Sequence, residues 1–341
     1  MSLKKMNPAL IAVLAVIIVF ASVGCEKLKV NKLQANHYFI KANQAFSEQK
    51  YRDAIENYEK ALELNPNLVQ AHRFLGESYK AVFSPGVETE RNMERADKAL
   101  EALKKAYEIS PENEEIIHSL ADMYDKLRNF EEAEKLFLKI LEMNPTNMSN
   151  YYVVAEFYKK YAGSRSEEEE GEKAENGEKT PFEKAEQMYL RRIELDPENP
   201  QGYAYIAQFY EDLEMSVKRI DQAYFYHDKR TDLEPDNPAA WLSKGVNRWS
   251  KAYRLQNRLS RAQRLQAAKE SESALLKASE LDPKYPEPYS WLSVIYQSVL
   301  AKIDPDRAQR YIQDGQMYIE RYKEAREAEA ERQKLAQELK K

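Results

Sequence analysis

The sequence predicts an all-α chain built from repeated pairs of helices, and three observations lead to this prediction. Only 9 of the 341 residues are Gly, whereas glycine-rich phosphate loops and sheets with many tight turns need more. Stretches of helical composition end repeatedly at an Xaa-Pro pair, where proline denies the helix a backbone donor. Hydrophobic residues make up 43% of the chain, which is ample for a packed core.

Charged residues are dense but almost balanced. There are 52 Lys and Arg against 57 Asp and Glu, so the net charge is −5. Proteins that bind nucleic acid are usually basic, and we therefore predict no nucleic-acid partner. Length alone would suggest about two domains of roughly 150 residues each, but that rule does not apply to repeat arrays.

The first 25 residues have the pattern of an export signal. Lys4 and Lys5 provide a positive start, and residues 9–23 contain no charged side chain. These 15 residues would form a helix of about 22 Å. A helix that crosses a bilayer needs roughly 20 residues, so this segment is too short. The segment is therefore more typical of a signal peptide than of a permanent span, although an uncleaved anchor is the alternative.

The residues that follow, Ser22-Val23-Gly24-Cys25, resemble the signal of bacterial lipoproteins, with Ser22 in place of the usual Leu. The resemblance implies that Cys25 carries acyl chains, palmitate among them, and becomes the first residue of the mature protein. Two or more acyl chains give stable anchoring. The expected location is the bacterial cell envelope: the periplasmic face of the outer or inner membrane, or the cell surface.

The proline pairs mark the repeat length. They lie at Pro66, Pro111, Pro145, Pro197, Pro235 and Pro283, with spacings of 45, 34, 52, 38 and 48 residues. The 34-residue unit is the shortest, and it has Ile117, Leu120, Ala121, Tyr124, Ala133, Phe137 and Pro145 in the pattern W-x2-L-G-x2-Y, A-x3-F, P. This unit resembles the tetratricopeptide repeat (TPR) family.

The resemblance implies an α-solenoid, a right-handed TPR superhelix of about seven helix-turn-helix repeats with insertions between the helices of a repeat. The expected organisation is a signal peptide at 1–24, a lipidated Cys and tether at 25–34, TPR units at 35–68, 69–113, 114–147, 148–199, 200–237, 238–285 and 286–322, and a charged helix at 323–341. One continuous array accounts for the chain.

Three of the units contain long insertions. Residues 80–90 include Ser-Pro-Gly and predict a loop, whereas residues 163–180 are acidic and predict a disordered segment or solvated flap. Residues 249–270 contain neither Pro nor Gly and predict a lengthened, projecting helical hairpin. There Arg254, Arg258 and Arg261 are expected on one helical stripe, either facing anionic lipid headgroups or forming the wet side of a packed helix.

No catalytic motif occurs. The four His residues lie in separate repeats, and the sequence has no HExxH, GxSxG or P-loop string. We therefore predict that the chain is not an enzyme and that it uses neither a cofactor nor a metal.

TPR proteins usually hold a partner peptide, helix or loop along the first helices of the repeats, in a concave groove. By i, i+4 spacing the groove candidates are Phe39, Asn43, Arg73, Glu77, His118, Asp122, Tyr152, Glu156, Ala204 and Gln208. Asn43 matches one element of the clamp that some family members use for C-terminal carboxylates. The carboxylates of Glu77, Asp122 and Glu156 instead favour a basic helix or loop; the alternative is that they are ordinary solvated helix residues.

The predicted function is a non-enzymatic, lipid-anchored scaffold that binds one or more envelope proteins. In domain plan it resembles lipoproteins that assemble outer-membrane barrels or type IV pilus secretins, which is one alternative. The other is an accessory subunit that positions an envelope enzyme. The sequence leaves the identity of the partner and the oligomeric state open.

Overall fold

The structure is a computed structural model that describes residues 30–162, 177, 179–213 and 215–338, and no strand occurs among them. The helices form two compact units, one up to Pro145 and one from Thr146 onward, where a single continuous array was expected. Each unit is a stack of helical hairpins. The predicted all-α TPR-type solenoid is therefore confirmed. The predicted lipidation site, Cys25, lies outside the described residues.

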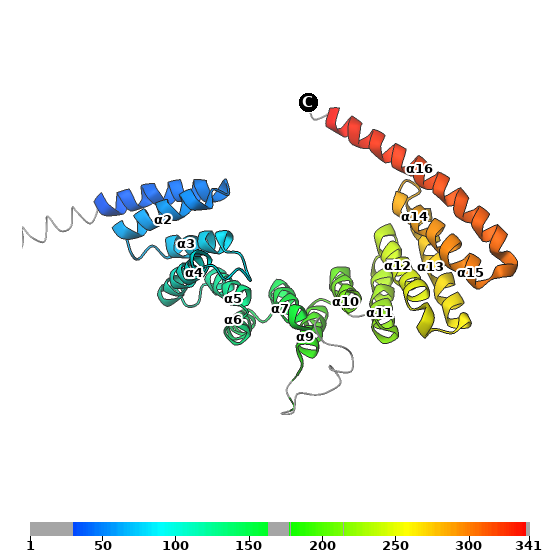
Figure 1. Ribbon diagram of the computed structural model, residues 1–341, viewed down its shortest axis with the longest axis horizontal. Helices are drawn as coiled ribbons and strands as arrows, with labels where there is room; N and C mark the ends of the chain where they lie inside the picture. Colours follow the sequence, from blue (N-terminus) through cyan, green and yellow to red (C-terminus); the bar gives the residue numbers. More distant parts are fainter. Residues whose placement is uncertain (1–29, 163–176, 178, 214, 339–341) are drawn as a thin grey trace, which may run out of the picture. The chain divides into compact units, whose positions relative to one another are not determined.

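The first unit contains three helical hairpins (Figure 1). They pair residues 30–47 with α2 (Tyr51–Leu64), α3 (Val69–Val82) with α4 (Glu90–Ile109), and α5 (Glu114–Lys126) with α6 (Phe130–Met143). Successive hairpins pack through α2 on α3 and α4 on α5, and the first helices α3 and α5 also touch. Side chains of α3 can therefore meet side chains of α5 directly.

The described residues of the second unit form four hairpins, and the long C-terminal helix is the second helix of the last one. These helices are drawn in green to red in Figure 1. It pairs α7 (Met148–Ala162) with α9 (Pro181–Leu195), α10 (Pro200–Asp212) with α11 (Val217–Leu233), and α12 (Pro238–Arg254) with α13 (Arg261–Leu281). The last hairpin joins α14 (Pro286–Ile295), the π-helical turn η3 (Tyr296–Leu300) and α15 (Ala301–Ile303), through the turn η4 (Pro305–Arg307), to α16 (Ala308–Glu338). Most of the predicted acidic flap at 163–180 lies outside the described residues.

At four of the boundaries between repeats, the proline that ends one repeat also anchors the next. Six residues after it, a side chain of the following helix bonds the prolyl carbonyl: the pairs are His72 with Pro66 (2.8 Å), Tyr203 with Pro197 (3.0 Å), Trp241 with Pro235 (2.8 Å) and Tyr289 with Pro283 (3.1 Å). Ile117 has no donor at this position, and Lys139 of α6 bonds Pro111 instead, at 2.8 Å. The recurring aromatic residue therefore closes the turn between repeats as well as filling space.

A second recurring bond joins neighbouring repeats. The tyrosine near the end of a first helix donates its hydroxyl to a glutamate of the preceding second helix, as in Tyr79 with Glu59, Tyr210 with Glu186 and Tyr296 with Glu272. Arg248 replaces this tyrosine in α12. Its guanidinium bonds Asp221 of α11 at 2.9 Å and stacks on Tyr224, 3.8 Å from the ring centroid. The departure from the repeat pattern at Arg248 therefore preserves the contact between repeats.

Small residues allow the two helices of a repeat to approach closely. A Cβ on Gly76 of α3 would lie 2.5 Å from the Cγ of Leu103 on α4, and one on Gly245 of α12 would lie 2.7 Å from the Cγ of Leu275 on α13. The unusual Ser271 of α13 donates its hydroxyl to the carbonyl of Gly245 at 2.8 Å. A larger residue at Gly76 or Gly245 would therefore push the two helices of its repeat apart.

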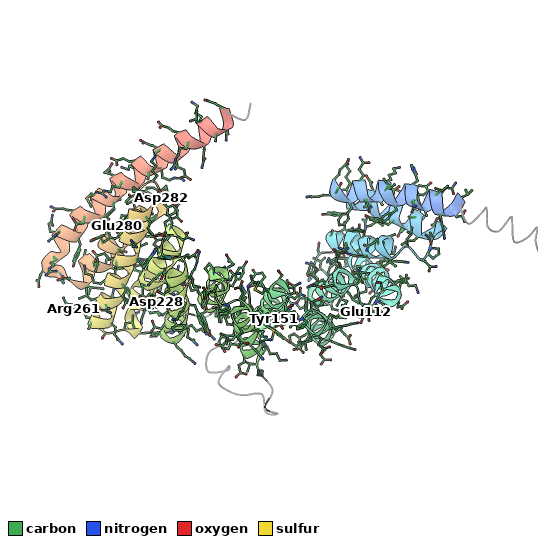
Figure 2. All side chains as sticks on the ribbon, turned by 180° about the vertical axis from the view of Figure 1, so that it is seen from behind. Glu112, Tyr151, Asp228, Arg261, Glu280 and Asp282 are labelled. Atoms are coloured by element: carbon green, nitrogen blue, oxygen red, sulfur yellow. The ribbon has the colours of Figure 1, made fainter. Side chains whose placement is uncertain are left out.

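The prediction that Arg254, Arg258 and Arg261 lie on one stripe of a single helix is wrong. Helix α12 ends at Arg254, Arg258 closes the 3-10 turn η2 (Gln256–Arg258), and α13 begins at Arg261. Arg261 is labelled in Figure 2. The physical reason is a capping box, in which Ser260 accepts from the backbone of Gln263 and Gln263 accepts from the backbone of Ser260. This box starts a new helix without Pro or Gly.

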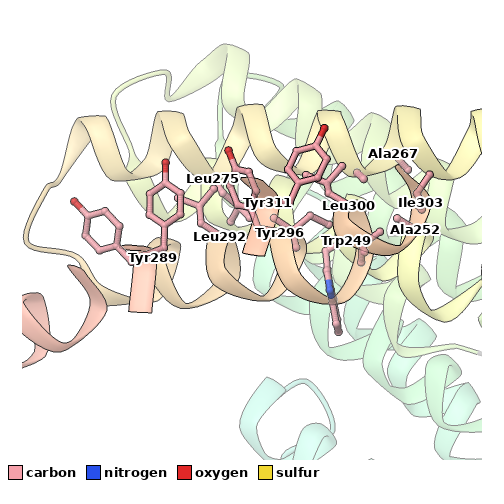
Figure 3. Packing of buried hydrophobic residues seen from close by; sticks show 14 of the residues in the cluster. Trp249, Ala252, Ala267, Leu275, Tyr289, Leu292, Tyr296, Leu300, Ile303 and Tyr311 are labelled. Atoms are coloured by element: carbon pink, nitrogen blue, oxygen red, sulfur yellow. The ribbon is translucent and has the colours of Figure 1, made fainter. Parts of the chain in front are cut away.

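The lengthened α12–α13 hairpin packs against the last repeat. Ala252 of α12 and Ala267 of α13 lie in the hydrophobic cluster that also contains Leu300 and Ile303 (Figure 3). The alternative in which the arginines are the wet side of packed helices is therefore supported. No helix in the described ranges is both long enough and apolar enough to cross a membrane.

Candidate functional site

The candidate residues of the first hairpin contact their own repeat. Phe39 packs on Tyr58 of α2 with ring centroids 5.9 Å apart. Asn43 accepts a hydrogen bond from the hydroxyl of Tyr58 at 2.7 Å. The Tyr58 side chain is fully buried, so this bond satisfies a polar group in the core. Asn43 therefore has a structural partner, which weakens its assignment to a carboxylate clamp.

Lys80 connects two of the candidate carboxylates on the first helices α3 and α5. Its ammonium lies 2.9 Å from Glu77 one turn earlier and 2.7 Å from Asp122 of the next repeat. Burial lowers the pKa of Lys80, but attraction to Glu77 and Asp122 outweighs burial and the pKa is raised. Two carboxylates thus share one cation, and we call Glu77, Lys80 and Asp122 the α3–α5 cluster.

A second ion pair lies on the same two helices. Arg73 of α3 pairs with Glu115 of α5, and its guanidinium lies 4.8 Å from the ring centroid of Phe74. His118 lies 3.8 Å from Glu114 within α5. The positive charge of Arg73 is therefore already paired within the repeat stack.

The second unit contains a similar cluster on α7 and α10. Lys159 lies 2.8 Å from Glu156 one turn earlier and 3.2 Å from Asp212 of the next repeat. Burial lowers the pKa of Lys159, and hydrogen bonds and attraction to both carboxylates raise it above its usual value. Glu156 also accepts from the buried hydroxyl of Tyr189. Glu156, Lys159 and Asp212 form the α7–α10 cluster.

Aromatic residues lie one turn before the α7–α10 cluster. Tyr152 of α7 and Tyr205 of α10 have ring centroids 4.3 Å apart, and the guanidinium of Arg192 lies 5.0 Å from the Tyr205 ring. Ala204 is half-buried and Gln208 is exposed on α10. The structure therefore combines stacked tyrosines with a shared pair of carboxylates on the first helices of neighbouring repeats.

Sequence reasoning did not identify Lys80 and Lys159. Both follow a candidate glutamate by three residues, so the repeated Glu-x-x-Lys pattern was a signal that could have found the intrahelical pairs. Asp122 was a groove candidate and Asp212 was not, and no local spacing pairs either aspartate with its lysine, because each belongs to the next repeat.

The three arginines of the α12–α13 hairpin contact protein groups. Arg254 stacks near Trp249, with its guanidinium 5.6 Å from the ring. Arg258 donates to the carbonyl of Met215 at 3.2 Å, and Arg261 donates to the carbonyl of Ile303 at 2.8 Å. Arg254 therefore contacts its own helix, whereas Arg258 and Arg261 each bond to another segment, and these different contacts argue against a common lipid-facing stripe.

No group of three or more His, Cys, Asp or Glu side chains that could hold a metal ion occurs in the part of the chain that the structure describes. The arrangement of the two clusters is suited to ion pairing and stacking with a partner chain.

Comparisons with known proteins agree with this architecture. Family profiles described as "Tetratricopeptide repeat" and "TPR repeat" match residues 92–155 and 42–82, and no curated protein sequence matches the chain. The C-terminal part of a TPR repeat-containing protein from Cytophaga hutchinsonii has 14% identity and a TM-score of 0.53, over 82% of this chain and 93% of that one. At this identity the similarity concerns the fold alone.

Two further solved structures have lower TM-scores. The MamA protein has 19% identity and a TM-score of 0.42, covering 60% of this chain and 93% of its own. YrrB, described as a TPR protein with an unusual peptide-binding site, has 20% identity and a TM-score of 0.40, covering 64% and 96%. The profile matches and the stacked hairpins together show that this chain belongs to the tetratricopeptide repeat family.

Proposed function

We propose that this chain is a non-enzymatic scaffold, anchored in the bacterial cell envelope through lipid on Cys25, which binds a basic helix or loop of another envelope protein. TPR repeats are generally interaction modules, and this supports the scaffold class. The observation that carries the proposal is the pair of clusters in which two carboxylates share one lysine on the first helices of neighbouring repeats.

Each cluster keeps one uncompensated negative charge, because two carboxylates face a single ammonium. Asp122 and Asp212 are also the solvent-accessible members, with 42% and 44% of their side chains exposed. A lysine or arginine of a partner can therefore pair with these aspartates while Lys80 and Lys159 hold the glutamates. Such pairing favours basic segments over acidic ones and speeds encounter at low salt.

Tyr152 and Tyr205 add an apolar and cation-binding surface beside the α7–α10 cluster. A partner arginine can stack on a tyrosine ring as Arg192 already does from the other side. We therefore expect the bound segment to contain arginine or lysine together with apolar residues.

The proposal is tested by charge changes at Glu77, Asp122 and Glu156. Recovery of partners crosslinked in intact cells and identified by mass spectrometry should fall by about tenfold or more when all three become Lys. The change turns the net charge of both clusters from negative to positive, and each of the three reversals weakens binding of a basic segment by roughly 0.5 kcal/mol or more. The isosteric set of Gln, Asn and Gln keeps hydrogen-bond acceptors and should give a smaller loss in the same partners.

A matched control reverses three exposed acidic residues on second helices: Asp97 of α4, Glu131 of α6 and Glu280 of α13. This control changes net charge by the same amount and should leave partner recovery unchanged. Equal recovery with the test and control sets would contradict an acidic binding face. The recovered partner also separates the alternatives, because a barrel or secretin favours an assembly role and a hydrolase or transferase favours an enzyme accessory.

The anchor is tested separately. Replacement of Cys25 by Ser should block incorporation of labelled palmitate and removal of the signal. A Cys25→Ser chain that still incorporates palmitate would contradict lipidation at this residue, without affecting the test of the binding face.

A further inference from the structure

Three exposed apolar side chains lie on the outer face of the first described helix, residues 30–47, beside the exposed polar residues His37 and Gln44. Val30, Leu33 and Ile40 are 51%, 71% and 67% exposed, and their spacing places them within one helical stripe. The opposite face packs inward through Ala35 and Ala42, which are fully buried. The helix therefore buries its inner apolar face, whereas the described residues leave Val30, Leu33 and Ile40 uncovered on the outer face.

An apolar outer face is unexpected at the end of a repeat stack. Terminal repeats of solenoids need a polar outer face, since no further repeat covers them. The other end of the chain follows this rule, because the last turns of α16 are rich in Glu, Lys, Arg and Gln. The stripe formed by Val30, Leu33 and Ile40 thus requires an apolar partner.

The charge of this helix narrows the choice of partner. Residues 30–47 contain no Asp or Glu, although the chain as a whole contains 57 among 341 residues and about three would be expected in a segment of this length. Lys32 and Lys41 are both exposed on the helix. An apolar stripe flanked by lysines, with no acidic residue, matches a surface that is apolar inside and anionic outside, as a phospholipid bilayer is.

The position of the helix supports the same partner. Val30 follows Cys25 by five residues, which can span at most about 18 Å even when fully extended. A lipid on Cys25 would therefore hold the start of the helix within reach of the headgroups. We propose that the outer face of residues 30–47 lies in the membrane interface, with Val30, Leu33 and Ile40 among the acyl chains and Lys32 and Lys41 at anionic headgroups.

This inference rests on the lipid anchor proposed above, and the single Cys allows the two to be tested apart. The full chain is purified from membranes and reconstituted into vesicles of phosphatidylethanolamine and phosphatidylglycerol. Leu33→Cys then provides a thiol for a fluorophore, because an acylated Cys25 has none. The matched control is Leu138→Cys, since Leu138 is also an exposed leucine, at 39%, but lies on α6.

Brominated lipid should quench the fluorophore at position 33 at least about twofold more than at position 138, because an interfacial helix buries its apolar face roughly 5–10 Å below the headgroups. Equal quenching at the two positions in a chain that stays in the vesicles would overturn the inference and leave the anchor intact. A disulfide between two Leu33→Cys chains in place of quenching would also overturn it, by assigning the face to a second copy. A parent chain whose Cys25 reacts with maleimide would overturn the anchor and the inference together.

Discussion

Replacement of Gly76 by Ala sets helix propensity against packing. In an isolated helix this change is stabilising by about 1 kcal/mol. In the structure the new Cβ would lie 2.5 Å and 2.9 Å from the Cγ and Cδ2 of Leu103 and 3.1 Å from the backbone carbonyl of Ala99. Leu103 is fully buried and cannot rotate into solvent, and the carbonyl belongs to α4 itself.

The magnitude follows from the two opposing terms. Forcing an extra methyl group into a packed core costs typically 1–3 kcal/mol, and the contact with both a buried side chain and backbone places Gly76 at the upper end, about 2–3 kcal/mol. After subtraction of the propensity gain of about 1 kcal/mol, we expect Gly76→Ala to lower the unfolding free energy by about 1–2 kcal/mol.

The assay is urea unfolding followed by far-UV circular dichroism, with two comparison variants. Gly202→Ala is the matched control, because its nearest neighbour is the side-chain Cγ1 of Ile193 at 3.2 Å, and we expect a change between zero and about 0.5 kcal/mol of stabilisation. In a Leu103→Ala background the clashing atoms are absent, so Gly76→Ala should cost at least about 1 kcal/mol less than in the parent chain. Stabilisation by Gly76→Ala in both backgrounds would refute the packing argument.

Three further predictions concern polar contacts. Lys80→Met should lower the midpoint of urea unfolding by an amount equivalent to about 1 kcal/mol, because two partly buried carboxylates lose their shared cation. The same variant should bind a basic peptide more tightly in calorimetry, and weaker peptide binding would contradict the assigned role of Lys80. Ser260→Ala should cost about 1 kcal/mol by removing a helix cap, while Ser260→Asp should retain most of the stability. Burial, and then the adjacent glutamate, raise the pKa of Tyr79, Tyr210 and Tyr296 above the usual value of 10.0. These hydroxyls therefore contribute stability that is fully present below pH 10 and is lost as the pH rises through their folded pKa. The temperature of thermal unfolding should fall at strongly alkaline pH, and this fall should be smaller in the Tyr79→Phe variant.

Much of the fold was predictable because its determinants are local. A proline directly after a helix prevents the helix from continuing, as Pro66 does after α2. An aromatic residue six positions later closes the turn to the preceding prolyl carbonyl, as Tyr203 does with Pro197. The hairpin of α12 and α13 was predicted, but the position of its turn between Arg254 and Arg261 was not, although the determinant of that turn is also local. The segment has no Pro or Gly, but the capping box of Ser260 and Gln263 starts α13 there by accepting hydrogen bonds from the first backbone N–H groups of the helix.

The candidate site was less predictable, because its contacts join different repeats. Glu156 was identified from its position on a first helix, but its partner Lys159 was not, and Asp212 lies 53 residues away from that lysine. Insertions of different length separate successive repeats, so no constant spacing connects such residues. The clusters are therefore visible only when the helices are stacked.

The sequence by itself determined that this chain is an array of helical hairpins, since scarce glycine, recurring proline and the aromatic positions act within one repeat. The prediction of a location in the cell envelope also comes from the sequence alone, because the single Cys25 follows an uncharged segment. The tertiary structure alone decided which charges are compensated and which apolar faces remain uncovered. Both depend on the neighbours that packing brings to a side chain, and Lys80 between two carboxylates and Leu33 with 71% exposure are the clearest examples.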